Sequence, residues 1–246
     1  MLNEKEFERY SRQILSESIG EEGQQKLSKI KILQIGTGGL GSPCALYLTA
    51  AGIGELRIID NDTVSVSNLQ RQILYSEADV GQEKVKVAKE RLSSLNSSVN
   101  IKAYKDYVDD ESIKKYINDI DFLIDCSDNM KTKFLVNRTG IQNNIRTVIA
   151  GIKDFYGQIL TINPKESACY QCVFSEPEEE DDSESPLPVI GVTAGVLGTL
   201  EALEVIKTVL GLPNLENQLL MVNLLNMTFN KIKVIKDENC FCYCME

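Results

Sequence analysis

A short apolar run that ends in a glycine-rich turn constrains the fold more than any other feature of this sequence. The run KIKILQIG (29–36) leads into GTGGLG (36–41), an apolar stretch covers 40–51, and ELRIID (55–60) comes next. A strand, a helix and a strand within about 30 residues almost always close right-handed, with the two strands parallel. The sequence therefore predicts an α/β fold built on a parallel sheet.

Alternating helical and strand patterns continue beyond this unit. Helices are expected at about 81–95, 110–117 and 130–143, and strands at 99–104 and 121–126. Such alternation is typical of a doubly wound, Rossmann-like sheet with helices on both faces.

The pattern changes in the last third of the chain. The runs RTVIAGI (146–152) and YGQILTINP (156–164) are separated by a short link, which favours antiparallel pairing. Two more strand-like runs flank Asn226, and an apolar helix rich in small residues is expected at 192–210. The predicted sheet is therefore mixed, with a parallel N-terminal part and antiparallel C-terminal strands.

The domain organisation follows from the continuity of this pattern. A chain of 246 residues has room for one large domain or two small ones. Because no boundary interrupts the pattern, we expect a single domain over 1–246. Residues 1–28 form a helical arm, and about 173–192 form an acidic, flexible crossover loop.

Charge and composition exclude several classes of function. The net charge is −10, but residues 175–185 hold seven carboxylates and no cation, which leaves −3 for the remainder. Nucleic-acid binding requires a basic stripe, and neither part has one. No apolar run approaches the roughly 20 residues that span a bilayer, and the charged N-terminus is unlike a signal peptide, so no membrane contact and a cytoplasmic location are expected. The absence of histidine removes imidazole as a general base.

The glycine-rich turn is the first candidate site. Backbone amides of Gly36, Gly38, Gly39 and Gly41 would face a phosphate at the start of the following helix. Asp60 ends the next strand, where a carboxylate can bind ribose hydroxyls. A structural turn and an NAD-dependent oxidoreductase are the alternatives.

The segment after that strand separates these alternatives. It carries Asn68, Arg71 and Gln72, and Lys84 follows thirteen residues after Arg71. An arginine fork and a lysine point charge suit a triphosphate, whereas a dehydrogenase does not need two cations beside its nucleotide. The alternative is that both cations are surface ion-pair partners.

A third candidate follows the strand at 121–126. The motif DCSDN places Asp125, Asp128 and Asn129 at the carboxyl edge of the sheet. Magnesium usually binds one or two carboxylates together with substrate phosphates, so Asp128 is the candidate Mg²⁺ ligand. Asp128 would alternatively, or additionally, cap the helix that begins near Met130.

Seven cysteines complete the set of candidates. Two groups of cysteines that lie far apart in the chain predict a structural Cys₄ zinc site; the alternative is that these cysteines are unrelated reduced thiols. Cys44 follows the glycine loop and Cys126 ends a predicted strand, so both are expected to be small buried core residues. The zinc candidates are Cys169 and Cys172, with two of Cys240, Cys242 and Cys244.

These motifs occur together in one order: RYSRQI, GTGGLG, DNDTVSVSNLQRQ, VGQEK, DCSDN, CYQC and a cysteine-rich C-terminus. In this the chain resembles the MoeB/ThiF/HesA family, the bacterial relatives of ubiquitin-activating enzymes, over nearly its whole length except about 175–190. The resemblance implies an adenylyltransferase. Such proteins adenylate the C-terminal glycine of a small ubiquitin-like sulfur carrier with a Gly-Gly tail, using ATP and Mg²⁺ in a homodimer.

The resemblance also assigns roles to individual residues. It implies that Gly39, Asp60, Ser67 to Arg71 and Lys84 contact ATP, that Asp128 is the catalytic magnesium ligand beside Asn129, and that Arg12 reaches the partner subunit's phosphate site. The predicted catalytic residues are Arg12, Arg71, Lys84 and Asp128. The predicted nucleotide-binding set is Gly36, Gly38, Gly39, Gly41, Asp60, Asp62, Ser67, Asn68, Leu69, Gln70, Arg71, Gln72, Lys84, Asp128 and Asn129. The intact catalytic set argues against a binding module that has lost catalysis.

The chain departs from the family pattern twice. The family's second cysteine pair has the spacing CxxC, whereas Tyr243 stands at that distance from Cys240, so which terminal cysteines bind zinc stays open. Many relatives also carry a cysteine in the loop before the small-residue helix, and 186–192 contains none. The reaction is therefore expected to stop at the acyl-adenylate, with sulfur delivered by a separate sulfurtransferase. The substrate stays open between a molybdopterin-pathway carrier, a thiamine-pathway carrier and a ribosomal peptide.

Overall fold

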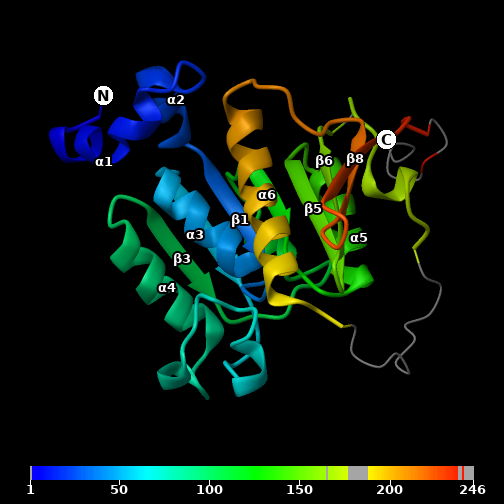
Figure 1. Cartoon of the computed structure of the whole chain (residues 1–246), viewed down its shortest axis with the longest axis horizontal. Helices are drawn as coiled ribbons and strands as arrows, with labels where there is room; N and C mark the ends of the chain where they lie inside the picture. The colour runs from blue at the N-terminus through cyan, green and yellow to red at the C-terminus, as the bar shows by residue number, and fades with distance from the viewer. Residues whose placement is uncertain (1, 165, 177–187, 238–239, 241–246) are drawn as a thin grey trace.

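The computed structural model describes residues 2–164, 166–176, 188–237 and 240 (Figure 1). Within them, one eight-stranded sheet has the order β3-β2-β1-β4-β5-β6-β7-β8. Along this order, the five strands β3, β2, β1, β4 and β5 pair in parallel. The strands from β5 to β8 pair antiparallel, as predicted. The strands are β1 (Lys31–Ile35), β2 (Glu55–Ile59), β3 (Asn100–Tyr104), β4 (Phe122–Asp125), β5 (Arg146–Lys153), β6 (Tyr156–Ile162), β7 (Gln218–Asn223) and β8 (Thr228–Lys233).

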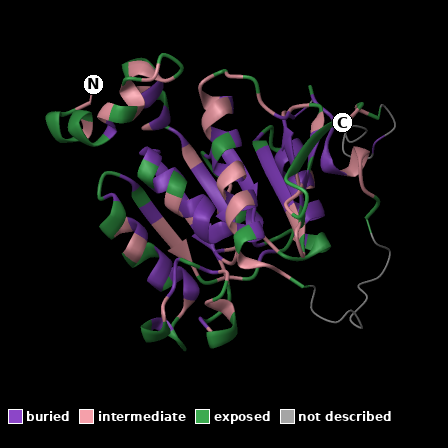
Figure 2. Ribbon diagram, in the orientation of Figure 1, coloured by how far each residue is buried: buried purple, intermediate pink, exposed green. Residues whose placement is uncertain are grey.

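Helices cover both faces of this sheet. The described helices are α1 (Glu4–Ile14), α2 (Gly20–Leu27), α3 (Gly41–Ala51), α4 (Lys84–Leu95), α5 (Met130–Gln142) and α6 (Gly191–Val209). Helices α3, α4 and α6 lie in front of the sheet in Figure 1, and α5 lies behind it. Figure 2 shows the buried strands between these two layers.

Neighbouring residues of one strand belong to two separate apolar cores. In β1, Ile32 packs with α3 and α4, whereas Leu33 packs with α5 on the other face. Both residues are fully buried. This explains why apolar residues stand side by side at these two positions instead of alternating with polar ones, as is typical of a parallel sheet covered on both sides.

The predicted strand–helix–strand unit, the helices near 81–95, 130–143 and 192–210, and the C-terminal hairpin are all present. The helix expected at 110–117 is wrong, because only a short 3-10 turn, Ile113–Lys115, forms there. The Asp109 carboxylate accepts hydrogen bonds from the backbone N–H groups of Glu111 and Ser112, at 3.0 and 2.7 Å. Side-chain bonds of this kind compete with a helix ladder.

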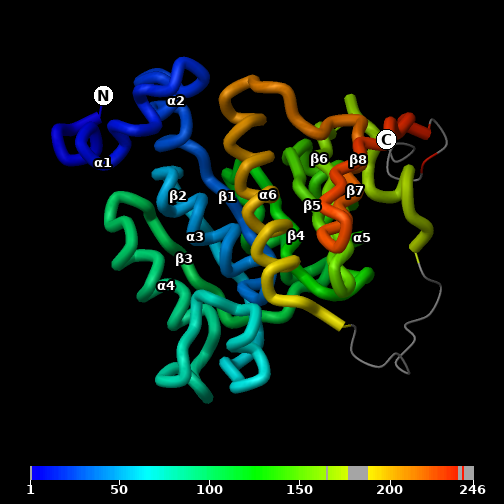
Figure 3. Tube along the Cα trace, in the orientation of Figure 1, coloured from blue at the N-terminus to red at the C-terminus, as the bar shows by residue number. Residues whose placement is uncertain are grey.

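The N-terminal segment contains the two helices α1 and α2. It is held to the domain through Tyr10, whose phenol oxygen accepts a hydrogen bond from Asn96 Nδ2 at 2.8 Å. Helix α1 and strand β8, the first and last elements described, lie at opposite sides of the molecule (Figure 3). Most of the predicted acidic loop, residues 177–187, lies outside the described residues. Among the helices described, none is both long enough and apolar enough to cross a membrane.

Candidate functional site

The glycine-rich loop joins β1 to α3 at the carboxyl edge of the sheet. Gly36 has a φ of +89°, and a side chain there would place its first carbon 2.8 Å from the carbonyl oxygen of Cys126. A side chain at Gly41 would come within 2.2 Å of the Gly36 carbonyl oxygen. Only glycine fits both positions, so the loop is tight, lies against the end of β4, and presents the start of α3 to an anion.

Asp60 braces this loop from the end of β2. Its Oδ2 accepts hydrogen bonds from the N–H and the hydroxyl of Thr37, at 2.8 and 2.9 Å. Tyr75 donates its hydroxyl to Thr37 Oγ1 at 2.8 Å, and burial raises the pKa of Tyr75, which keeps the phenol protonated as a donor. Sequence reasoning missed Thr37 and Tyr75; Thr37 stands inside the glycine motif, whereas nothing local marks Tyr75.

Arg71 and Gln72 lie against the glycine loop. A side-chain carbon built on Gly39 would lie 3.5 Å from Arg71 Cδ, and one built on Gly38 would lie 3.5 Å from Gln72 Nε2. Gln72 is 3% exposed, and its Oε1 has no hydrogen-bond partner within the described parts of the chain. A buried acceptor without a partner at the rim of the loop suits a bound polar ligand.

The residues that precede Arg71 differ in their surroundings. Ser67 accepts a hydrogen bond at its carbonyl from Arg71 Nη1, at 3.0 Å, and this contact orients the guanidinium. Asn68 Oδ1 accepts from the backbone N–H of Ser65 at 3.2 Å, and Gln70 is exposed. The side chain of Leu69 packs against the apolar core, so only its backbone is available to a ligand.

Lys84 opens α4 and is 4% exposed. Its ammonium forms an ion pair with Asp62 at 2.7 Å, and the Asp62 side chain is 61% exposed. A cation at the start of a helix opposes the helix dipole, and the Asp62 carboxylate offsets this. From the sequence, the alternative for Lys84 was a surface ion pair. The structure contains an ion pair, but Lys84 itself is buried.

Asp128 lies in the loop that follows β4. The predicted alternative that it caps α5 is wrong, because Asn129 has the extended backbone of a capping residue and accepts from Thr132 N at 2.8 Å. Asp128 is exposed, and its carboxylate makes no hydrogen bond to any other described residue. Since β1 and β4 are parallel neighbours, Asp128 and the glycine loop lie at the same edge.

A buried ion pair that sequence reasoning missed holds this loop. Lys133 Nζ donates to Asp125 Oδ2 at 2.6 Å and to the carbonyl oxygens of Ser127 and Ala150, at 2.8 and 2.7 Å. Burial alone would lower the pKa of Lys133, but the Asp125 carboxylate raises it above its usual value. The lysine therefore stays charged and joins the end of β4 and the middle of β5 to the segment that carries Asp128.

Within one subunit, Arg12 lies away from the other predicted catalytic residues. It is exposed on α1, and nearby Tyr10 packs against Gly52 at the far end of α3 from the glycine loop. The eleven residues of α3 span about 16 Å. Arg12 can therefore serve such a site only from another subunit.

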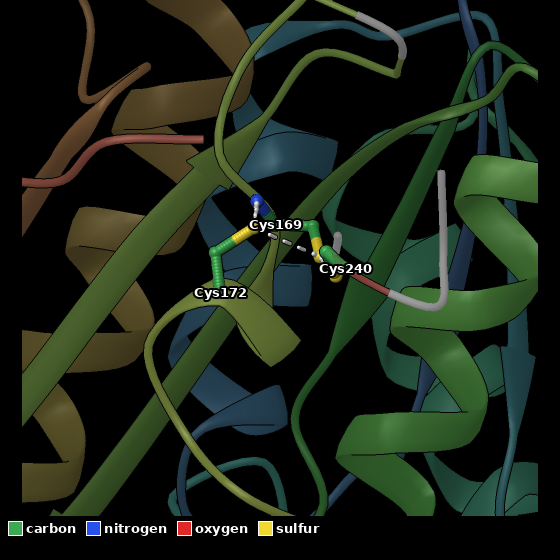
Figure 4. Close-up of side chains that lie close together, drawn as sticks. All are labelled: Cys169, Cys172 and Cys240. Carbon is green, nitrogen blue, oxygen red and sulfur yellow. Dashed lines mark hydrogen bonds between the residues drawn. The ribbon is translucent and has the colours of Figure 1, made fainter. Parts of the chain in front are cut away.

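Three of the predicted zinc ligands lie together (Figure 4). The Cys169 sulfur is 3.7 Å from that of Cys172 and 3.6 Å from that of Cys240. Metal–sulfur bonds of about 2.3 Å in a tetrahedral site place the sulfurs about 3.8 Å apart, so the three thiols fit zinc. The remaining candidates, Cys242 and Cys244, lie outside the described residues.

The chain is similar in sequence and in fold to several known proteins. The chain is 40% identical over 212 residues to the sulfur carrier protein ThiS adenylyltransferase of Escherichia coli K12, covering 86% of this chain and 84% of that protein. It is 40% identical over 235 residues to the adenylyltransferase and sulfurtransferase MOCS3 of Xenopus laevis, covering 94% of this chain and 52% of that protein. A crystal structure of E. coli MccB with ATP superposes with a TM-score of 0.86 at 25% identity, covering 98% and 75% of the two chains. The sequence profile of the ThiF family matches residues 10–244, and the chain therefore belongs to this family.

Proposed function

We propose that this chain is an ATP-dependent adenylyltransferase that activates the C-terminal glycine carboxylate of a small ubiquitin-like sulfur carrier protein. The observation that carries this is the meeting of the glycine loop, Arg71 and the free Asp128 carboxylate at one edge of the sheet. The relatives named as adenylyltransferases support it.

In this proposal, ATP lies across the carboxyl ends of β1, β2 and β4. Amides of the glycine loop bind phosphate oxygens, and Asp60 binds the ribose. Arg71 and Lys84 neutralise the phosphates, and Lys84 is held ready by its ion pair with Asp62. Two cations and a free carboxylate favour a triphosphate site over the rival NAD-dependent oxidoreductase.

The chemistry proceeds without a general base. The carrier's terminal carboxylate is already ionised at neutral pH, and one of its oxygens forms a bond to the α-phosphorus of ATP. The bond from that phosphorus to the α,β-bridging oxygen breaks, and pyrophosphate leaves with its electron pair. Arg71 and Lys84 stabilise the charge that develops on the phosphates. Asp128 would hold Mg²⁺, which neutralises phosphate charge when bound.

Arg12 belongs to the same proposal through a homodimer. Its place near the opposite end of α3 excludes its own subunit's glycine loop, so we propose that it reaches the phosphates bound by the partner subunit. A mixed dimer of Arg12→Ala and Asp128→Ala subunits would then hold one complete site.

Two further parts of the proposal concern partners and zinc. A separate sulfurtransferase would consume the acyl-adenylate; the Xenopus relative carries both activities in its name, and this chain spans 52% of it. Zinc would be bound by Cys169, Cys172, Cys240 and one of Cys242 and Cys244. We take 1–246 as one adenylating domain, with the arm at 1–28 and the acidic crossover loop at about 173–192.

The test is ATP–pyrophosphate exchange with Mg²⁺ and a panel of Gly-Gly carriers and candidate peptides, one at a time. We expect exchange that depends on one carrier, that is lost in Asp128→Ala, and that is kept in the exposed control Asp110→Ala. The mixed dimer should recover exchange that neither parent variant has. Exchange that survives in Asp128→Ala, or that depends on a peptide alone, would refute the respective assignment.

A further inference from the structure

A second group of metal-binding side chains lies in the interior, away from the Cys169 cluster. Cys44 stands in the first turn of α3, Cys126 directly follows β4, and Glu201 is in the middle of α6. All three are buried, at 0%, 5% and 0% exposure. One ligand atom from each lies within 4.8 Å of the others.

The contacts inside this group leave one oxygen unsatisfied. The Cys126 thiol donates to Glu201 Oε2, with sulfur and oxygen 3.3 Å apart. Glu201 Oε1 is buried and has no hydrogen-bond partner among the residues described. The nearby cation, Lys133, already donates to Asp125 and to two backbone carbonyls. A buried carboxylate oxygen without a donor is unfavourable unless something else binds it.

We propose that Cys44, Cys126 and Glu201 form a buried binding site for a divalent metal ion of the zinc class. A metal with bonds of about 2.3 Å to sulfur and about 2.1 Å to oxygen places two such ligands about 3.6 Å apart at the tetrahedral angle, close to the 3.3 Å observed here. The unpartnered Oε1 would supply a fourth bond through a bidentate carboxylate.

The ligand chemistry selects the metal. Thiolates are soft ligands that suit zinc, whereas magnesium and calcium require oxygen ligands. Binding releases the two thiol protons to solvent, and the ion is then held by two thiolates and the Glu201 carboxylate. Because the site is closed on all sides, the ion enters as the chain folds, and it would exchange more slowly than zinc at the half-buried Cys172.

This site would join three elements that frame the glycine loop and Asp128. Cys44 lies three residues after Gly41, and Cys126 lies two residues before Asp128. A metal ion bound to all three side chains would link the start of α3 to the end of β4 and to α6. The proposed metal site does not require that the chain catalyses adenylation.

The experiment measures zinc per chain in the purified full-length protein. We expect two equivalents in the wild type, and one in both Cys44→Ala and Glu201→Gln. The matched control is Glu204→Gln, which makes the same change at another buried glutamate of α6 and should keep both equivalents. A Cys169→Ala, Cys172→Ala double variant should keep only the interior ion.

A second experiment uses cobalt binding and does not require that the Cys44→Ala and Glu201→Gln variants fold. The Cys169→Ala, Cys172→Ala chain, refolded with Co²⁺, should bind one equivalent and show a near-ultraviolet thiolate-to-cobalt charge-transfer band. No band in that chain would overturn the proposal. So would a wild type with a single zinc equivalent that only the double variant loses, or two equivalents that persist in Cys44→Ala and Glu201→Gln.

Discussion

Replacing Lys133 by methionine tests how much the buried ion pair contributes to the fold. The lysine is 5% exposed and its partner Asp125 is fully buried, so the variant leaves a carboxylate in the interior with only Ser127 Oγ, at 2.6 Å, and the more distant Ser127 N–H. It also frees the carbonyl oxygen of Ala150, which lies 2.7 Å from the ammonium. Removing one member of a buried pair lowers the free energy of unfolding by about 3–5 kcal/mol, a large share of the about 5–15 kcal/mol typical of a domain.

The assay is urea unfolding followed by circular dichroism, together with a thermal melt. At about 2–4 °C per kcal/mol for a chain of this size, the melting temperature of Lys133→Met should fall by about 6–20 °C. The exposed pair of Lys114 with Glu111 supplies the control, and Lys114→Met should melt like the wild type. Adding Asp125→Asn to Lys133→Met should recover part of the loss, because it removes the uncompensated charge. A Lys133→Met chain as stable as Lys114→Met would refute the reasoning.

Three further predictions follow from other parts of the structure. Removing the proposed zinc from the Cys169 cluster with a chelator should lower the melting temperature while leaving the ATP affinity by calorimetry within a few-fold, because structural zinc couples to folding; a large loss of affinity alone would contradict this. Gly41→Ala should weaken ATP binding at least tenfold because of its close approach to a backbone oxygen, whereas Gly195→Ala, where a side chain has open space, should bind like the wild type. The hydrogen bond from Tyr116 to Asp106, together with burial, raises the pKa of Tyr116 to about 12, so its stabilisation is present below pH 10 and is lost as the pH rises from about 10 to about 12. The difference in unfolding free energy between the wild type and Tyr116→Phe should shrink over that interval, and a constant difference would contradict the assignment.

The sequence predicts features that depend on short stretches of chain. The strand, the glycine turn and the helix at 29–51 follow from local apolar pattern, and Arg71 lies against the loop because the chain returns there directly after β2. Features that depend on through-space contact were missed: Lys133 bonds to oxygens up to 17 residues away, and nothing near it in sequence marks the pair. The helix predicted at 110–117 is absent because of a local contact: the carboxylate of Asp109 binds backbone N–H groups and outweighs the helical pattern.

The strand order has a consequence for synthesis of the chain on the ribosome. Strand β1 pairs on one side with β2 nearby, but on the other with β4, where Ile32 meets Phe122, 90 residues later. At roughly 5–20 residues per second, that edge of β1 stays without its partner for about 5–20 s of translation. The apolar strand in the middle of the parallel part of the finished sheet is therefore the part of the nascent chain most exposed to mispairing, and a pause in translation before β4 would prolong that interval.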